Sequence, residues 1–177
     1  MYTDKKTKER VEVGRRLEIA LSMLGFNQGL IQFADSKANG LVVVSSIFLA
    51  SLAPAIEHVR TAPLPVKALA GVSCAASVLA LLASLRVMLA RAHDTHEPRP
   101  KSLLYHKHIL GFSKAQSYVD EVRESEAEKV LESFLMSNYD LAAIASAKFA
   151  AYKTAERLTL LGALLWIAAE VALVVGN

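Results

Sequence analysis

The chain has 177 residues, of which 53% are hydrophobic but only 7% aromatic, with a net charge of +3 and one cysteine. A soluble domain of this length has too little interior to bury so much apolar surface, so an ordinary soluble globule is excluded and a membrane protein is favoured. The single cysteine excludes a disulfide framework within the chain, and Lys and Arg are too dispersed for a nucleic-acid surface.

Residues 1–37 predict an amphipathic helix on the cytosolic side of a membrane. Apolar residues recur there every three or four positions, which places them on one helix face. They are Val13, Leu17, Ala20, Leu24, Ile31 and Ala34.

Residues 38–92 predict a transmembrane hairpin. The 19 residues 38–56 and the 18 residues 68–85 contain no charged side chain, and about 20 apolar residues suffice to cross a bilayer as a helix. Pro54, Pro63 and Pro65 are expected to bracket an outer loop, because proline tends to end or begin a helix.

The remaining chain predicts a cytosolic loop and long helix over 93–157 and a third transmembrane helix over 158–177. Pro98 and Pro100 indicate the loop, a short helix or turn is expected within 102–112, and Ser125 with Glu128 matches a capping box for the long helix. The predicted fold class is therefore an all-α membrane protein with three transmembrane helices and a helical cytosolic region.

The distribution of Lys and Arg predicts the orientation. Seven lie in residues 1–37 and eleven in 86–157, against two in the loop between the first spans and none after the third. Cytosolic segments carry the excess of Lys and Arg, so we expect a cytoplasmic N-terminus and an outer C-terminus.

Three charged residues at or inside the spans each allow two interpretations. Asp35 and Lys37, at the start of the first span, are either interfacial anchors or charges that fix the preceding arm against other helices or touch a ligand. Glu170 lies past the middle of the third span, where a carboxylate is costly unless it is protonated, paired or hydrated. It is either near the outer interface or directed into the interior of an assembly.

No catalytic motif stands out, so we predict a protein that is not an enzyme and has no metal or cofactor. His93-Asp94 could belong to a metal phosphohydrolase, but the further ligands that such a site needs are missing around it. His106 and His108 are poorly spaced for zinc.

Several short segments together resemble the Pycsar transmembrane effectors of bacteria. They are Ala34-Asp35-Ser36-Lys37-Ala38 before the first span, Ser102-Leu103-Leu104-Tyr105 after the second, and Ala147-Lys148-Phe149 before the third. In order and spacing the likeness covers about residues 30–175.

The resemblance implies an antiphage effector of the bacterial inner membrane. A partner cyclase would make cyclic CMP or cyclic UMP on infection, and the effector, as a homo-oligomer, would disrupt the lipid bilayer and abort the infection. A ligand with one phosphate and a pyrimidine base calls for cations and an aromatic face. The candidate ligand-binding residues are Arg99, Lys101, Tyr105, Lys107, Lys148, Asp35 and Lys37.

Three alternatives remain open at this point. The chain could be an effector of a related defence system with another signal or none, a membrane scaffold without a ligand, or a nucleotide hydrolase built on His93-Asp94. A neighbouring cyclase gene would favour the Pycsar interpretation, and bound metal in the purified protein would favour the hydrolase.

Overall fold

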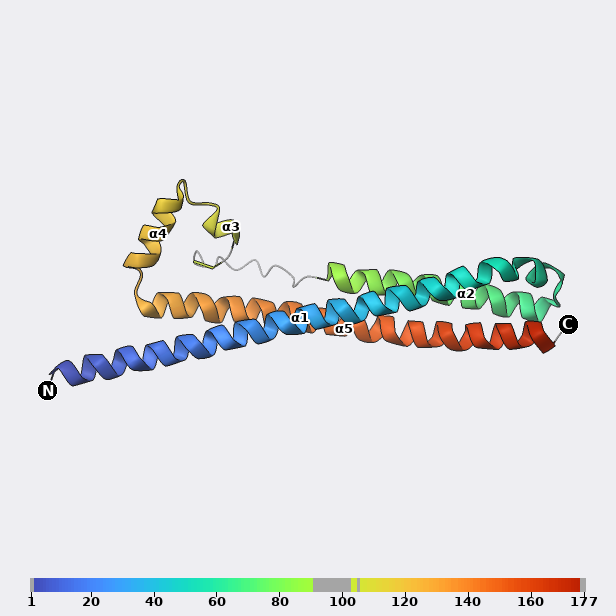
Figure 1. Ribbon diagram of the computed structural model, residues 1–177, viewed down its shortest axis with the longest axis horizontal. Helices are drawn as coiled ribbons and strands as arrows, with labels where there is room; N and C mark the ends of the chain where they lie inside the picture. The colour runs from blue at the N-terminus through green and yellow to red at the C-terminus, as the bar shows by residue number, and fades with distance from the viewer. Residues whose placement is uncertain (1, 91–102, 105, 176–177) are drawn as a thin grey trace. The chain divides into compact units, whose positions relative to one another are not determined.

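The computed structural model describes residues 2–90, 103–104 and 106–175. Within these residues the secondary structure is helical, without strands (Figure 1). The helices are α1 (Tyr2–Thr61), α2 (Leu64–Leu89), α3 (His106–Ile109), α4 (Ala115–Glu124) and α5 (Ala127–Val175).

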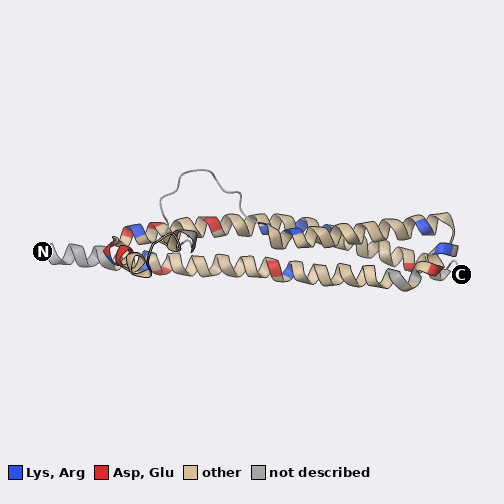
Figure 2. Ribbon diagram, turned by 90° about the horizontal axis from the view of Figure 1, so that it is seen from above, with Lys and Arg blue, Asp and Glu red and all other residues tan. Residues whose placement is uncertain are grey.

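Three of these helices are long and apolar enough to cross a membrane. The candidate spans lie within Val11–Ser51, Leu64–Leu89 and Ala127–Val174, and over long stretches the helices carry no charged residue (Figure 2). The predicted class, an all-α protein with three membrane-spanning helices, is thereby confirmed.

The chain divides into two compact units. The first comprises Met1–Ile31 and Ala92–Ala145, and the second comprises Gln32–Arg91 and Ser146–Asn177. Each unit therefore draws on parts of both α1 and α5, and we describe each one by itself.

In the first unit, paired amides hold the beginning of α5 against α1. The Asn27 Nδ2 donates to Asn138 Oδ1 at 2.7 Å, and the Asn138 Nδ2 donates to the Ala20 carbonyl at 3.3 Å. Asn138 is only 7% exposed. An amide pair of this kind, with one member buried, fixes the register of two helices, since a shift would leave both amides without partners.

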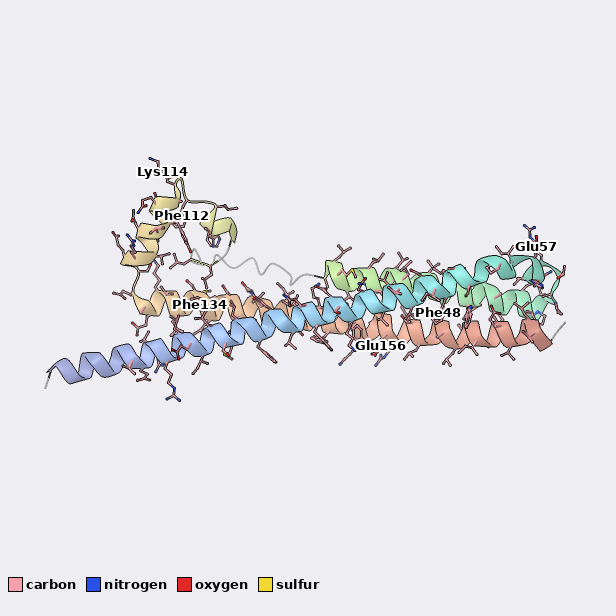
Figure 3. All side chains as sticks on the ribbon, in the orientation of Figure 1. Phe48, Glu57, Phe112, Lys114, Phe134 and Glu156 are labelled. Atoms are coloured by element: carbon pink, nitrogen blue, oxygen red, sulfur yellow. The ribbon has the colours of Figure 1, made fainter. Side chains whose placement is uncertain are left out.

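A short helix, α4, extends the first unit beside the start of α5. The Tyr118 hydroxyl donates to the Leu103 carbonyl at 3.1 Å, and its ring meets the Phe112 ring edge to face, with centroids 5.6 Å apart. Phe112 is labelled in Figure 3. Lys129 at the start of α5 pairs with Glu121 of α4 at 2.7 Å.

The capping-box prediction at Ser125 was wrong. The hydroxyl and the backbone N–H of Ser125 both donate to the Glu121 carbonyl, so Ser125 ends α4 instead of beginning α5. The sequence pattern did not reveal α4, whose carbonyls compete for the same hydroxyl.

In the second unit, α1, α2 and α5 form a three-helix bundle. Its core contains one buried residue from each helix, namely Ala38, Val87 and Ala155. The ring pairs Phe33–Phe149 and Phe48–Trp166 advance together along α1 and α5, which shows that these helices run parallel. The Phe48 ring stacks on the Trp166 ring with centroids 5.5 Å apart, and Figure 3 labels Phe48.

The helix α2 runs antiparallel to α5 in this bundle, and the hairpin that reverses the chain is short. Helix α1 continues through Pro54 to Thr61, and α2 begins at Leu64, so only Ala62 and Pro63 link them. The expectation that Pro54 ends the helix was wrong. Pro54 removes a single backbone donor, and the rest of the turn remains helical.

Candidate functional site

The residues that carried the family resemblance on α1 and α5 meet in the second unit. Ala34 and Ala38 are 1% and 0% exposed. Their small side chains, one turn apart, let α1 approach its neighbours closely at this level. Asp35 lies on the same turn, and its carboxylate Oδ1 is 2.6 Å from the ammonium Nζ of Lys148 on α5.

Lys148 is almost completely buried, and all of its donors are used. Its Nζ donates to Asp35 Oδ1 and also to the backbone carbonyls of Val87 at 3.0 Å and Met88 at 3.1 Å. A lysine ammonium has three hydrogens, so these three acceptors saturate it. We call this set, Asp35, Val87, Met88 and Lys148, the Lys148 junction.

The two carbonyls belong to the last turn of α2, which ends at Leu89. The last four carbonyls of a helix lack partners inside the helix and carry partial negative charge. The Lys148 ammonium supplies both hydrogen bonds and a positive charge at this point. Because a buried charge is tolerated only when it is paired and hydrogen-bonded, the side chain of Lys148 on α5 holds α1, at Asp35, and the carboxyl end of α2 together.

The two partners of the ion pair differ in exposure. The Lys148 side chain is 6% exposed, whereas that of Asp35 is 41% exposed. Solvent and solutes therefore reach the carboxylate but not the ammonium. In this arrangement Lys148 has no hydrogen left for a further acceptor unless Asp35 moves.

Aromatic rings flank the junction. Phe33 and Phe149 lie with their centroids 6.4 Å apart, and the Lys37 ammonium lies 5.3 Å from the centroid of Phe33. One turn after Lys148, the Tyr152 hydroxyl donates to Glu156 at 3.2 Å. Glu156 is labelled in Figure 3. Of the two interpretations of Asp35, the structure thus favours the one in which its charge fixes α1 against other helices, with Lys148 as the partner.

For most of the other predicted ligand residues the structure describes no side chain. Arg99, Lys101 and Tyr105 lie outside the described residues, and so does the side chain of Lys107, which belongs to the short helix α3. His93 and Asp94, on which the hydrolase alternative depends, also lie outside them. Within the described part of the chain, no three His, Cys, Asp or Glu side chains gather to hold a metal ion.

Glu170 lies on α5 and is partly exposed. The structure gives its carboxylate no hydrogen bond or ion pair among the described residues. The small residues of the third span do not all lie on an outer face. Ala169 is 1% exposed, and a Cβ added at Gly162 would meet Ser77 Oγ of α2 at 3.4 Å. Both of these residues are used for packing inside the bundle.

Sequence reasoning missed the role of the α2 carboxyl end and of several buried serines. Carbonyl acceptors leave no trace in the sequence. The spacing of Ser73, Ser77 and Ser84, four and then seven residues apart, does indicate one polar face on α2 and could have been noticed.

Taken together, three membrane-capable helices packed into a bundle, with a buried cation that holds the end of one span, define an integral membrane protein of helical type.

The chain belongs to the Pycsar effector family, since the model of the Pycsar effector protein domain matches residues 19–175. It is therefore an antiphage effector that responds to a cyclic-nucleotide signal from a cyclase, and it is located in a membrane. No curated protein and no solved structure matches the chain.

Proposed function

We propose that this effector senses cyclic CMP or cyclic UMP in the cytosol and responds by permeabilising the bacterial inner membrane, which aborts the infection. The family match over residues 19–175 carries this proposal. In this mechanism a partner cyclase supplies the nucleotide, and the effector binds it without chemical change.

The topology follows the distribution of charge. We propose that residues 1–37 and 93–157 lie in the cytosol, that the spans are 38–56, 68–85 and 158–177, and that the C-terminus lies outside. A reporter fused after Asn177 tests this orientation. It should be active in the periplasm, and activity only in the cytosol would overturn the topology.

The Lys148 junction suggests how a nucleotide acts on the bundle. A phosphate is an anion, as Asp35 is, and the Asp35 carboxylate is 41% exposed, so that solutes reach it. The phosphate displaces Asp35 from Lys148, and the ligand thereby binds one arrangement of the helices better than the other. Such differential affinity is what any ligand needs in order to shift a conformational equilibrium.

Arg99, Lys101, Tyr105, Lys107 and Lys37 remain proposed ligand contacts. Arg99→Ala and Lys101→Ala should weaken nucleotide binding and leave insertion intact, because a charged hydrogen bond contributes about 1.5–3 kcal/mol. Unchanged binding in both variants would remove these two residues from the site.

Permeabilisation needs several copies of the chain, because three spans are too few to enclose a wide path. We propose that α5 faces other copies through its exposed side, with Glu170 directed into the shared interior, where water hydrates the carboxylate.

The deciding experiment uses the full chain in lipid nanodiscs and in dye-loaded liposomes. Calorimetry with cyclic CMP and cyclic UMP should reveal binding of at least one of them, with cyclic AMP and cyclic GMP as controls. The same nucleotide should release the dye from liposomes, and chromatography should recover it unchanged. Absence of binding by both pyrimidine nucleotides would overturn the proposed signal, and hydrolysis of the nucleotide would favour the His93-Asp94 alternative.

A further inference from the structure

Three serine hydroxyls are enclosed inside the three-helix bundle and have no hydrogen-bond partner among the residues that the structure describes. They are Ser45 on α1 and Ser73 and Ser77 on α2, with exposures of 0%, 0% and 1%. The indole Nε1 of Trp166 on α5 is buried and unpaired in the same way. We call Ser45, Ser73 and Ser77 the serine seam.

Two other buried hydroxyls in this unit behave differently. Ser84 Oγ donates to the Ala80 carbonyl at 2.8 Å, and Thr159 Oγ1 donates to the Ala155 carbonyl at 2.9 Å. Each thus bonds back to its own helix, one turn earlier, as hydroxyls in apolar helices commonly do. The serines of the seam do not use this option.

Buried hydroxyls without hydrogen-bond partners are costly in a bundle that crosses a bilayer, because no water is present to bond to them. Small side chains alone would explain close helix packing, and alanine would serve that purpose equally well. Alanine does so at neighbouring buried positions of α2, namely Ala70, Ala76 and Ala80. Packing therefore does not account for the oxygen atoms of the seam.

One member of the seam, Ser77, lies at a close contact between α2 and α5. Ser77 Oγ faces Gly162 of α5, where an added Cβ would be 3.4 Å away. In the closed bundle these oxygens are sealed between helices. A displacement of α2 from α1 and α5 would open this contact and offer its hydroxyls to water.

We propose that the serine seam lines the path for water and small ions in the activated effector. The inference rests on the proposed permeabilising function and adds, to the interior shared by several copies that Glu170 faces, a hydroxyl-lined surface that becomes accessible when α2 moves. Hydroxyl groups replace part of the hydration of a passing ion, whereas an apolar lining would expel water from a narrow path. The unused hydrogen-bonding capacity of the resting bundle is then satisfied in the open state.

The chain provides matched controls for a test by cysteine labelling. The native Cys74 is exposed and adjacent to Ser73, and Ser46 is exposed and adjacent to Ser45. In a Cys74→Ala background we would introduce Ser45→Cys, Ser73→Cys, Ser77→Cys or, as the control, Ser46→Cys. A charged, membrane-impermeant thiol reagent is then applied from the periplasmic side in cells and from the cytosolic side in inside-out membrane vesicles, with and without the activating nucleotide.

Cysteines at the three seam positions should be labelled only after the nucleotide is added, while the cysteine at position 46, and Cys74 in the native chain, should stay unlabelled. A potential-sensitive dye records depolarisation in the same cells. Depolarisation without labelling of the seam would overturn this inference and leave the proposed function standing. Absence of depolarisation in the native chain would overturn both.

A second measurement does not depend on tolerance of the larger sulfur atom. The triple variant with alanine at Ser45, Ser73 and Ser77 should insert normally and lose most of the nucleotide-dependent leakage. Ser46→Ala should behave like the native chain. Native leakage from the triple variant at matched protein level would contradict the inference.

Discussion

The Lys148 junction and the serine seam lie in the same three-helix unit and treat polar groups in opposite ways. At the junction every ammonium hydrogen has an acceptor, whereas the hydroxyls of the seam have no partner in the described part of the chain. Satisfied contacts hold helices together, and unsatisfied ones favour any arrangement that brings water to them. The contrast separates residues that keep the bundle closed from residues that benefit when it opens.

The largest effect on activity is expected at Glu170. Like the hydroxyls of the serine seam, its carboxylate has no hydrogen-bond partner among the described residues. Glu170→Leu should insert and be at least as stable as the native chain, because the cost of a carboxylate inside the bilayer disappears. Nucleotide-dependent depolarisation, measured with a potential-sensitive dye, should be nearly lost, since an apolar ring expels water from a narrow path. Val171→Leu, at the exposed neighbouring position, serves as the control. Native leakage from Glu170→Leu would locate the residue near the outer headgroups.

The next largest effect is expected at the Lys148 junction, where every ammonium hydrogen has an acceptor. Lys148→Met keeps an unbranched side chain of similar length but removes the charge that both Asp35 and a phosphate require. The nucleotide concentration for half-maximal depolarisation should rise about ten- to hundredfold, the equivalent of one charged hydrogen bond. Lys153→Met, at an exposed position on the same helix, should leave this concentration unchanged. An unaltered response in Lys148→Met would show that the junction has no part in sensing.

Asp35→Asn should act in the opposite direction. The substitution leaves Lys148 with a neutral partner, and a phosphate displaces a neutral amide more easily than a carboxylate. The nucleotide concentration for half-maximal depolarisation should therefore fall by up to about tenfold. The same titration measures it. Opposite shifts in Asp35→Asn and Lys148→Met would distinguish exchange of partners from a purely structural ion pair, for which both substitutions would only lower stability.

The smallest effect on activity is expected in the other unit. Asn138→Ala removes the partner of Asn27 and should lower the free energy of unfolding by about 1–3 kcal/mol. The nucleotide concentration for half-maximal depolarisation should not change, because the two amides already have hydrogen-bond partners in the closed state. Thermal unfolding in detergent and the dye titration test the two statements separately. A shifted titration would show that this pair takes part in switching.

The sequence was sufficient to predict the fold class, because apolar segments of bilayer length form few structures other than transmembrane helices. It also identified Asp35 and Lys148 as residues of interest. It did not pair them, because they are 113 positions apart and their meeting depends on how α1 and α5 align. The seam was missed for a different reason. A serine in an apolar span is a small residue that such a span tolerates, so the sequence gives it no special role. Only the packed structure shows that its hydroxyl has no partner.

The two-residue connection between α1 and α2 has a mechanical consequence. At the Ala62–Pro63 end the two helices are tethered and cannot separate far. At its other end α2 is held by the Lys148 ammonium. When the bundle opens in response to the nucleotide, α2 can only pivot about this tether, and its displacement grows with distance from the turn. The free end of α2 then moves away from α1 while the connected end stays in place, so that Ser84 moves farther than Ser77 and Ser73 moves least. Water would enter from the Val87 end, on the side that we assign to the cytosol.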